Sequence, residues 1–393
     1  MHKLDERLSN TLNDLRSAGT YKVLRNIAAP MAPVTVIEGI GEVLVFCSNN
    51  YLGLADHPAV LEAGIAGLRQ YGAGTASVRF ICGSFECHRA LEQKVAEFFG
   101  AEAALTYTSC WNANEGLLPA ITEAGDAMVS DELNHASIID AGRLSRASRT
   151  VFAHSDMDAL ASALLETGAA PVKFVVTDGV FSMRGDYAPL DEIVAICDRH
   201  EADFAEGIIT IVDDSHGVGA FGASGRGTEE QTGGRADILI GTLGKAFGVN
   251  GGYVVADAAT VGYLRETSPT YIYSNPITPA EAAAAAESIR ILEGAEGRQR
   301  LKNLAQRSEQ LRTGLTDLGY ETIPGDHPIV PIMIRDTDKT SALVAHLFEN
   351  NILVTGLNYP VVPKGDEEIR LQVSASHTEA DIDYLLDALR GFR

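Results

Sequence analysis

The sequence has few of the features that would suit a nucleic-acid partner. Basic residues are scarce, because 31 Lys and Arg stand against 53 Asp and Glu, giving a formal net charge of −22. A surface this acidic repels a phosphate backbone, and no run of Lys and Arg offsets the repulsion. We therefore expect no nucleic-acid partner.

Long hydrophobic runs and paired cysteines are also missing. No stretch approaches the roughly 18 uninterrupted apolar residues of a membrane-spanning helix. The opening segment MHKLDERLSNTLNDLRSAG is charged throughout, unlike a secretory signal. Five cysteines without a CxxC pair argue against a disulfide framework and against a zinc site. The pattern predicts a cytoplasmic protein with no membrane segment and no metal.

What the chain does have is length and apolar content: 393 residues, of which 46% are hydrophobic. This is enough for a large core and more than one domain. Leu4, Leu8, Leu12 and Leu15 follow helical spacing and predict an amphipathic helix that ends near Gly19. Two β-rich segments, VTVIEG and EVLVFC, then predict a hairpin, so we expect residues 1–45 to form an N-terminal helix and hairpin arm.

Strand and helix patterns alternate through the middle of the chain. Short β-rich segments such as DAMVSD, VKFVVTDGVFS and GIITIVDDSH are separated by helical ones such as HRALEQKVAEFFG. This alternation predicts a large α/β domain over residues 46–285, with a mostly parallel sheet covered on both faces. Residues 286–393 mix strands such as EIRLQVS with helices and predict a smaller C-terminal α+β domain.

Two predicted strands end in residues that can carry chemistry, in TIVDDSHGVG (210–219) and GTLGKAFG (241–248). Ligands bind at the carboxyl ends of strands in a parallel sheet, which is where Asp213 and Lys245 fall. An ion pair between them is the simplest interpretation. The small residues around Lys245 favour another, because they let a planar ligand approach the backbone. A partly desolvated lysine is also a standard imine-forming nucleophile.

Two other catalytic patterns fit less well. Gly217, Gly219 and Gly222 spell GxGxxG after a predicted strand, but a dinucleotide site needs a helix there. The following ASGRGTEEQTGG is too rich in glycine for a helix. Asp213 and His216 suggest a hydrolase triad, yet the chain has no GxSxG elbow. An NAD-dependent oxidoreductase and a non-catalytic scaffold remain as alternative classes.

Seven segments together carry a family resemblance: SNNYLGL, GTASVRFICGS, SDELNHASIID, TDGVFSM, VDDSHGVG, GTLGKAFG and IRLQVSASHT. They resemble the α-oxoamine synthases, which condense an amino acid with an acyl-CoA thioester. The resemblance runs from about residue 20 to the C-terminus, with the motifs in the family's order. It implies the PLP-dependent transferase fold type I (aspartate aminotransferase-like), pyridoxal 5'-phosphate as cofactor, and a homodimer with a shared active site.

The resemblance assigns the catalytic roles to four residues. Lys245 would form an imine with the cofactor aldehyde and later remove the α-proton. Asp213 would face the pyridine nitrogen and keep it protonated, so that the ring acts as an electron sink. His216 would bind the phenolic oxygen of the ring, and His135 would stack on the ring face.

The same resemblance predicts how the phosphate is held. The backbone N–H groups of Ser109, Cys110 and Trp111 would bind it at a strand-to-helix turn, where a helix N-terminus suits a dianion. Thr242 would add its side chain. Ser274 would reach the phosphate of the neighbouring subunit.

Three further residues are predicted near the ring and the substrate. Ser182 would lie near the ring, and Asn49 would lie over the cofactor beside the carboxylate of the amino acid. Arg370 would pair with that carboxylate through its planar fork. Asn50 and Tyr51 are expected to shape the turn in SNNYLGL.

Within the family, VRFICGS, DGVFSM, YPVVPKG and SASHT favour members that condense glycine with acetyl-CoA to 2-amino-3-oxobutyrate and CoA, beside threonine breakdown. Two pairs depart from the pattern expected of those members. They are Trp111-Asn112, where Phe-Asp is usual, and Val249-Asn250 after the lysine. A relative that uses alanine or serine with a longer acyl-CoA therefore remains an alternative.

Overall fold

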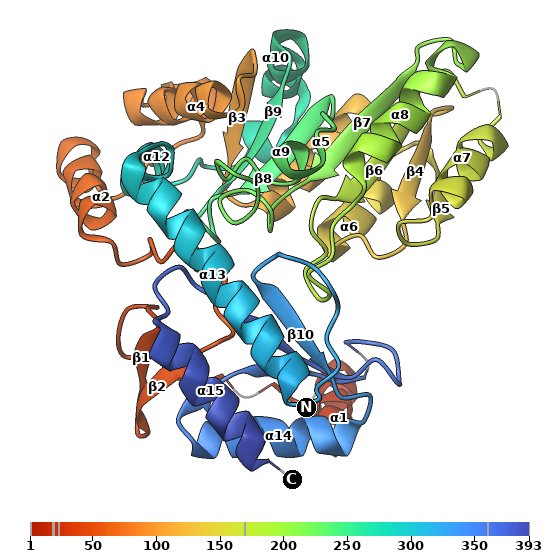
Figure 1. Ribbon diagram of the computed structural model, residues 1–393. Helices are drawn as coiled ribbons and strands as arrows, with labels where there is room; N and C mark the ends of the chain where they lie inside the picture. Colours follow the sequence, from red (N-terminus) through yellow and green to blue (C-terminus); the bar gives the residue numbers. More distant parts are fainter. Residues whose placement is uncertain (1, 18–19, 23, 169, 360, 393) are drawn as a thin grey trace.

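A computed structural model describes the chain except residues 1, 18–19, 23, 169, 360 and 393 (Figure 1). Its largest sheet has seven strands in the order β3-β9-β8-β7-β6-β4-β5. The strands are β3 (Ala103–Tyr107), β4 (Ala127–Asp131), β5 (Ser148–Phe152), β6 (Lys173–Asp178), β7 (Ile208–Asp213), β8 (Ile238–Thr242) and β9 (Gly252–Ala256). Only β9 is antiparallel to its neighbours, β3 and β8. The mostly parallel sheet is therefore confirmed.

Helices cover both faces of this sheet, which is why central strands such as β4 and β6 are buried along their whole length. On one face, apolar residues of three helices join a core with β3, β8 and β9: α5 (Cys110–Ile121), α6 (Ala136–Leu144) and α10 (Ala258–Thr267). The other face is covered by four helices: α4 (Glu86–Phe99), α7 (Met157–Glu166), α8 (Leu190–His200) and α12 (Pro279–Glu293). A further helix, α2 (Pro58–Tyr71), packs against α12, and the short helices are α3 (Arg79–Cys82), α11 (Pro269–Ile272) and the 3-10 turn η1 (Glu201–Asp203).

The smaller part of the protein contains two three-stranded sheets. In the first, β13 (Glu368–Gln372) lies between β10 (Ile329–Met333) and β12 (Thr355–Leu357), antiparallel to both. In the second, the N-terminal hairpin of β1 (Val34–Ile37) and β2 (Gly41–Val45) is extended by β11 (Ile352–Leu353), which runs parallel to β2. The helices of this part are α13 (Ala295–Asp317), α14 (Thr337–Glu349) and α15 (Glu379–Gly391). The hairpin thus shares a sheet with the C-terminal segment, and the predicted boundary at 285/286 falls inside α12.

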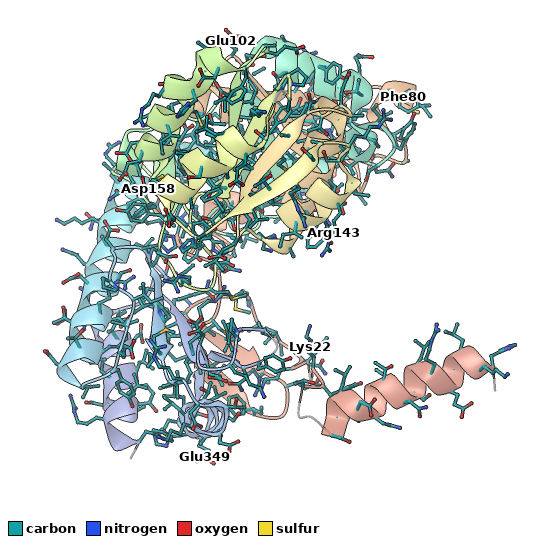
Figure 2. The ribbon with its side chains drawn as sticks, turned by 90° about the vertical axis from the view of Figure 1, so that its right-hand side faces the viewer. Lys22, Phe80, Glu102, Arg143, Asp158 and Glu349 are labelled. Atoms are coloured by element: carbon teal, nitrogen blue, oxygen red, sulfur yellow. The ribbon has the colours of Figure 1, made fainter. Side chains whose placement is uncertain are left out.

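The N-terminal helix α1 (Lys3–Ser17) projects away from the rest of the protein (Figure 2). Its four leucines, Leu4, Leu8, Leu12 and Leu15, are all exposed, so the predicted amphipathic face is not covered by the same chain. The predicted end near Gly19 lies outside the described residues.

One sequence expectation is wrong: the glycine-rich segment after β7 does contain a helix, α9 (Thr228–Thr232). Two hydrogen bonds hold the start of this helix: Thr228 donates its backbone N–H and its hydroxyl to the carboxylate of Asp214, at 2.6 and 2.7 Å. In the part of the chain that the structure describes, no helix has both the length and the apolar character needed to cross a bilayer.

Candidate active site

The predicted catalytic residues gather at one edge of the large sheet, where β3, β4, β6, β7 and β8 all end. Asp213 is the last residue of β7, and the parallel register pairs it with Asp178 at the end of β6. Lys245 follows the end of β8 by a short turn. Since these strands run in the same direction, their following loops meet at this edge.

Asp213 is buried and held as a hydrogen-bond acceptor. Its Oδ2 accepts from Nδ2 of Asn114, on α5, at 2.7 Å, and its Oδ1 accepts from the backbone N–H of Ser215 at 3.1 Å. The thiol of Cys110 lies 3.4 Å from Oδ2. The two N–H donors fix the orientation of the carboxyl group at the end of β7.

Lys245 is half-buried, and burial lowers its pKa against an opposing effect of Asp213. Among the residues that the structure describes, no carboxylate lies within 4 Å of its ammonium group. Lys245 and Asp213 therefore do not form the direct ion pair that is the simplest interpretation of the sequence. A partly desolvated amine without a contact partner is suited to attack a carbonyl carbon.

His135 caps the N-terminus of α6, and its ring is exposed at the site. Its backbone N–H donates to Oδ2 of Asp178 at 2.8 Å, and its Nδ1 lies 2.7 Å from Oγ of Ser137. The indole of Trp111 meets the imidazole edge-on, with 5.9 Å between ring centroids. Burial, together with the neighbouring Asp213, raises the pKa of Asp178 well above its usual range. The backbone and Nδ1 of His135 are thus held in place, and the exposed ring offers a face on which a planar group can stack.

The turn between β3 and α5 forms the predicted phosphate site. Ser109 is the N-cap of α5, and its Oγ accepts from the backbone N–H of Asn112 at 3.1 Å. The N–H groups of Cys110 and Trp111 belong to the first helical turn, which has no carbonyl partners inside the helix. A Cβ on Gly252 would stand 2.4 Å from the nitrogen of Cys110, so only glycine lets β9 lie against this turn.

Thr242, which is predicted to contact the phosphate, is the last residue of β8 and uses its hydroxyl within the chain. Its hydroxyl donates to the carbonyl of Gly251 at 3.1 Å and accepts from the N–H of Gly244 at the same distance. These bonds close the turn that leads to Lys245. The phosphate role of Thr242 stays a prediction.

Arg370 contacts Ser182 directly, and a residue that was not predicted, Gln372, joins it to Asn49. Arg370 donates to the carbonyl of Ser182 at 2.7 Å and to Oε1 of Gln372 at 3.1 Å. Gln372 in turn donates its amide N–H to Oδ1 of Asn49. The oxygen of Asn49 is thereby used, so its N–H groups are the part left to face an anion.

Arg370 keeps unused hydrogen-bonding capacity at this point. Its Nε is buried and has no partner among the described residues. Two of the five N–H groups that a guanidinium carries are used by Ser182 and Gln372. A buried donor without a partner is costly, and a carboxylate would satisfy it.

Tyr51 links this network to His216. Its buried hydroxyl accepts from Nε2 of Gln372 at 3.0 Å and lies 2.8 Å from Nδ1 of His216. With the oxygen already accepting, the hydroxyl proton is directed at Nδ1. Burial lowers the pKa of His216 well below its usual range, and Lys245 lowers it further, so the ring is neutral. We therefore assign the proton to Nε2, which makes this nitrogen a donor for a phenolic oxygen.

The opening motif SNNYLGL divides into two roles. Asn50 holds the turn, because its Oδ1 accepts from the N–H groups of Leu54 and Ala55 at 2.9 and 3.3 Å. Its Nδ2 donates to the carbonyl of Met31 at 2.9 Å. Tyr51, which was expected only to shape the turn, instead reaches His216.

Ser274 is not brought to the site within one chain. Its hydroxyl donates to the carbonyl of Asn275 at 3.3 Å, and among the described residues it forms no hydrogen bond with those named above. It lies beside the exposed ring of Tyr273, which meets the exposed ring of Phe80 edge-on.

Sequence reasoning missed Gln372, Asn114 and Asp178 as parts of this site. One signal could have found Gln372, since residues two apart on a strand share a face, and Arg370 lies two residues before it on β13. Asp178 ends a strand in TDGVFSM and could have been found by the same rule as Asp213. No local pattern marks Asn114.

The donor set as a whole fits pyridoxal phosphate. A buried carboxylate, a neutral imidazole donor, an exposed imidazole face and a free amine match its pyridine nitrogen, phenolic oxygen, ring and aldehyde in turn. The helix N-terminus at Ser109 fits its phosphate.

The family model described as aminotransferase class I and II matches residues 41–389. A 2-amino-3-ketobutyrate coenzyme A ligase of Salmonella typhimurium is 44% identical over 390 residues, covering 98% of this chain and 96% of the relative. An 8-amino-7-oxononanoate synthase of Thermosipho melanesiensis is 40% identical over 378 residues, covering 96% and 94%.

Solved structures share the fold. A serine palmitoyltransferase of Sphingomonas wittichii aligns with a TM-score of 0.91 at 30% identity, covering 99% of this chain and 96% of that one. A high-resolution structure of SPT with PLP as internal aldimine also gives 0.91, at 29% identity and coverage of 98% and 96%.

The chain therefore belongs to the aminotransferase class I and II family, with its fold type I architecture. Within that family, the relatives named above are α-oxoamine synthases, and the resemblance found in the sequence motifs is confirmed.

Proposed function

We propose that this protein is a pyridoxal-phosphate-dependent acyltransferase that condenses glycine with acetyl-CoA to give 2-amino-3-oxobutyrate and CoA. The observation that carries the proposal is the network that joins Arg370 and Asn49 through Gln372, beside the free amine of Lys245. It offers N–H donors to a carboxylate next to a cofactor site. The relatives named 2-amino-3-ketobutyrate coenzyme A ligase, at 40–44% identity, support the choice of glycine and acetyl-CoA.

The chain's own residues divide the work. Arg370 and Asn49 bind the carboxylate of the amino acid and so orient its α-carbon. Lys245 takes the α-proton, which its lowered pKa favours by leaving more of the amine neutral. When bound, the cofactor supplies an electron sink for the resulting charge. Asp213 holds the proton on the ring nitrogen, and His216 donates Nε2–H to the phenolic oxygen.

We also propose a homodimer in which Ser274 completes the partner's phosphate site. Two observations support it: the hydroxyl of Ser274 bonds to the carbonyl of Asn275 and not to the site of its own chain, and aromatic rings are exposed beside it. Phe80 is 63% exposed and Tyr273 74% exposed. A cytoplasmic location is proposed as well, supported by five free thiols. A human relative carries a name that places it in mitochondria.

A second candidate is the condensation of alanine or serine with a longer acyl-CoA. The 40% identity to an 8-amino-7-oxononanoate synthase favours it, and so does Trp111 on the first turn of α5, where its 39% exposed indole can change the space above the cofactor.

CoA release distinguishes these functions. Glycine, alanine and serine are each combined with acyl-CoAs from acetyl to palmitoyl, and free thiol is measured. We expect the highest kcat/KM for glycine with acetyl-CoA. A preference for alanine or serine with a longer chain would support the second candidate, and no thiol release with any pair would refute both.

A further inference from the structure

The strongest cluster of titratable side chains outside the predicted site surrounds His154, in the turn after β5. Its Nδ1 lies 3.1 and 3.2 Å from the two carboxylate oxygens of Asp131, and its Nε2 lies 3.4 Å from Oδ2 of Asp186. The ring of Phe181 packs edge-on against the imidazole, with 4.3 Å between centroids. The side chain of His154 is 14% exposed and that of Asp131 is 2% exposed. Both nitrogens of one imidazole are thus held between two carboxylates.

The carboxylate of Asp131 anchors the start of the loop that carries His135. Asp131 is the last residue of β4, and its Oδ1 accepts from the backbone N–H of Leu133 at 2.8 Å. Its Oδ2 accepts from the N–H of Ser155 at 3.0 Å. The chain from β4 to the N-cap of α6 therefore starts from a carboxylate whose position His154 fixes.

Asp186, which carries the second carboxylate, anchors the loop that carries Ser182. Asp186 closes the turn after β6, because the N–H of Phe181 donates to its carbonyl at 2.9 Å and Nε of Arg184 donates to its carboxylate at 2.7 Å. Inside this turn, the carbonyl of Ser182 accepts from Arg370. The position of Asp186 therefore affects the anchor for the substrate carboxylate.

We propose that His154 is a positioning residue that ties the loop carrying His135 to the loop carrying Ser182. It thereby sets the spacing between the stacked cofactor ring and Arg370, and this part of the inference rests on the proposed function. Burial alone would lower the pKa of His154, but the hydrogen bonds to Asp131 and Asp186 raise it to about 9. The imidazole is therefore charged at neutral pH and attracts both carboxylates.

The experiment uses the chain's single tryptophan as a reporter. Because Trp111 contacts the ring of His135, acrylamide quenching of its fluorescence reports the β4–α6 loop in cofactor-free protein. Glycine affinity, measured from spectral changes of the protein loaded with pyridoxal phosphate, reports the Ser182 loop. The variants are His154→Gln and Asp186→Asn. The matched control is His200→Gln, which removes an imidazole that pairs with Asp203 at 2.8 Å elsewhere.

We expect His154→Gln to change both readouts. The quenching constant of Trp111 should rise, and the glycine Kd should rise about tenfold, which corresponds to the loss of one charge-assisted hydrogen bond. Asp186→Asn should raise the glycine Kd and leave Trp111 quenching at the wild-type value. His200→Gln should change neither.

His154→Gln with wild-type quenching and wild-type glycine affinity would overturn the proposal, even if its thermal stability fell. If that variant does not fold, unchanged glycine affinity in Asp186→Asn overturns it instead. If wild-type protein binds no glycine, the proposed function fails, while quenching of Trp111 without cofactor still decides whether His154 positions the His135 loop.

Discussion

Replacing Arg370 by lysine tests the anchor for the substrate carboxylate. The guanidinium donates to the carbonyl of Ser182 and to Gln372, and its buried Nε has no partner. Lysine keeps the charge and can keep one of these bonds. It loses the planar fork that can face a carboxylate while still contacting the protein.

The expected size of the effect follows from the hydrogen bonds that lysine cannot make. A hydrogen bond to a charged group contributes about 1.5–3 kcal/mol, so losing one should weaken glycine binding about 10- to 150-fold. Cofactor binding should not change, because Asp213 and Ser109, which are expected to hold the ring nitrogen and the phosphate, form no hydrogen bond with Arg370, and lysine can keep the bond to the carbonyl of Ser182.

The assay is a glycine titration of the loaded protein, followed by its visible spectrum, with cofactor content measured in parallel. Arg226→Lys is the matched control, because Arg226 is also half-buried and donates to the carbonyl of Phe98 at 2.6 Å, but takes no part in the site. Glycine affinity equal to that of wild type in Arg370→Lys would remove Arg370 from the substrate site and refute the reasoning.

Three further predictions concern the cofactor bond, pH and a helix cap. Lys245→Ala should lack the visible band near ~420 nm that a lysine imine of pyridoxal phosphate gives, and a band that persists after dialysis would contradict the role of Lys245. Ion pairing raises the pKa of His154 to about 9, so its contribution to stability is fully present below about pH 6.5 and is lost as the pH rises through about 9. In denaturant titrations, the excess unfolding free energy of wild type over His154→Gln should therefore shrink by ~3 kcal/mol between pH 6 and pH 10, and a constant difference would show that the imidazole is not charged. Ser109→Ala removes the cap on α5 and should lower the unfolding free energy by about 1 kcal/mol, whereas an unchanged denaturation midpoint would mean that the cap does not contribute.

The large sheet and the centre of the site could be predicted because they depend on local pattern. A strand covered on both faces, such as β7, is an almost unbroken apolar segment, and Asp213 ends it. The anchor network could be predicted only in part. Gln372 and Asn49 are separated by most of the chain, and their contact depends on how β13 meets the turn at SNNYLGL. Hydrogen bonds between distant segments leave no periodic signal in either one.

The pairing of β11 with β2 has a consequence for synthesis. The hairpin at residues 34–45 is synthesised early, but its sheet also needs Ile352 and Leu353, which are added near the end of translation. Domains fold as units once their parts have emerged, so the central α/β layers can form first, while the hairpin waits with its edge unpaired. Nascent chains stalled before residue 352 should therefore be cut by protease near the hairpin, and chains released at full length should resist.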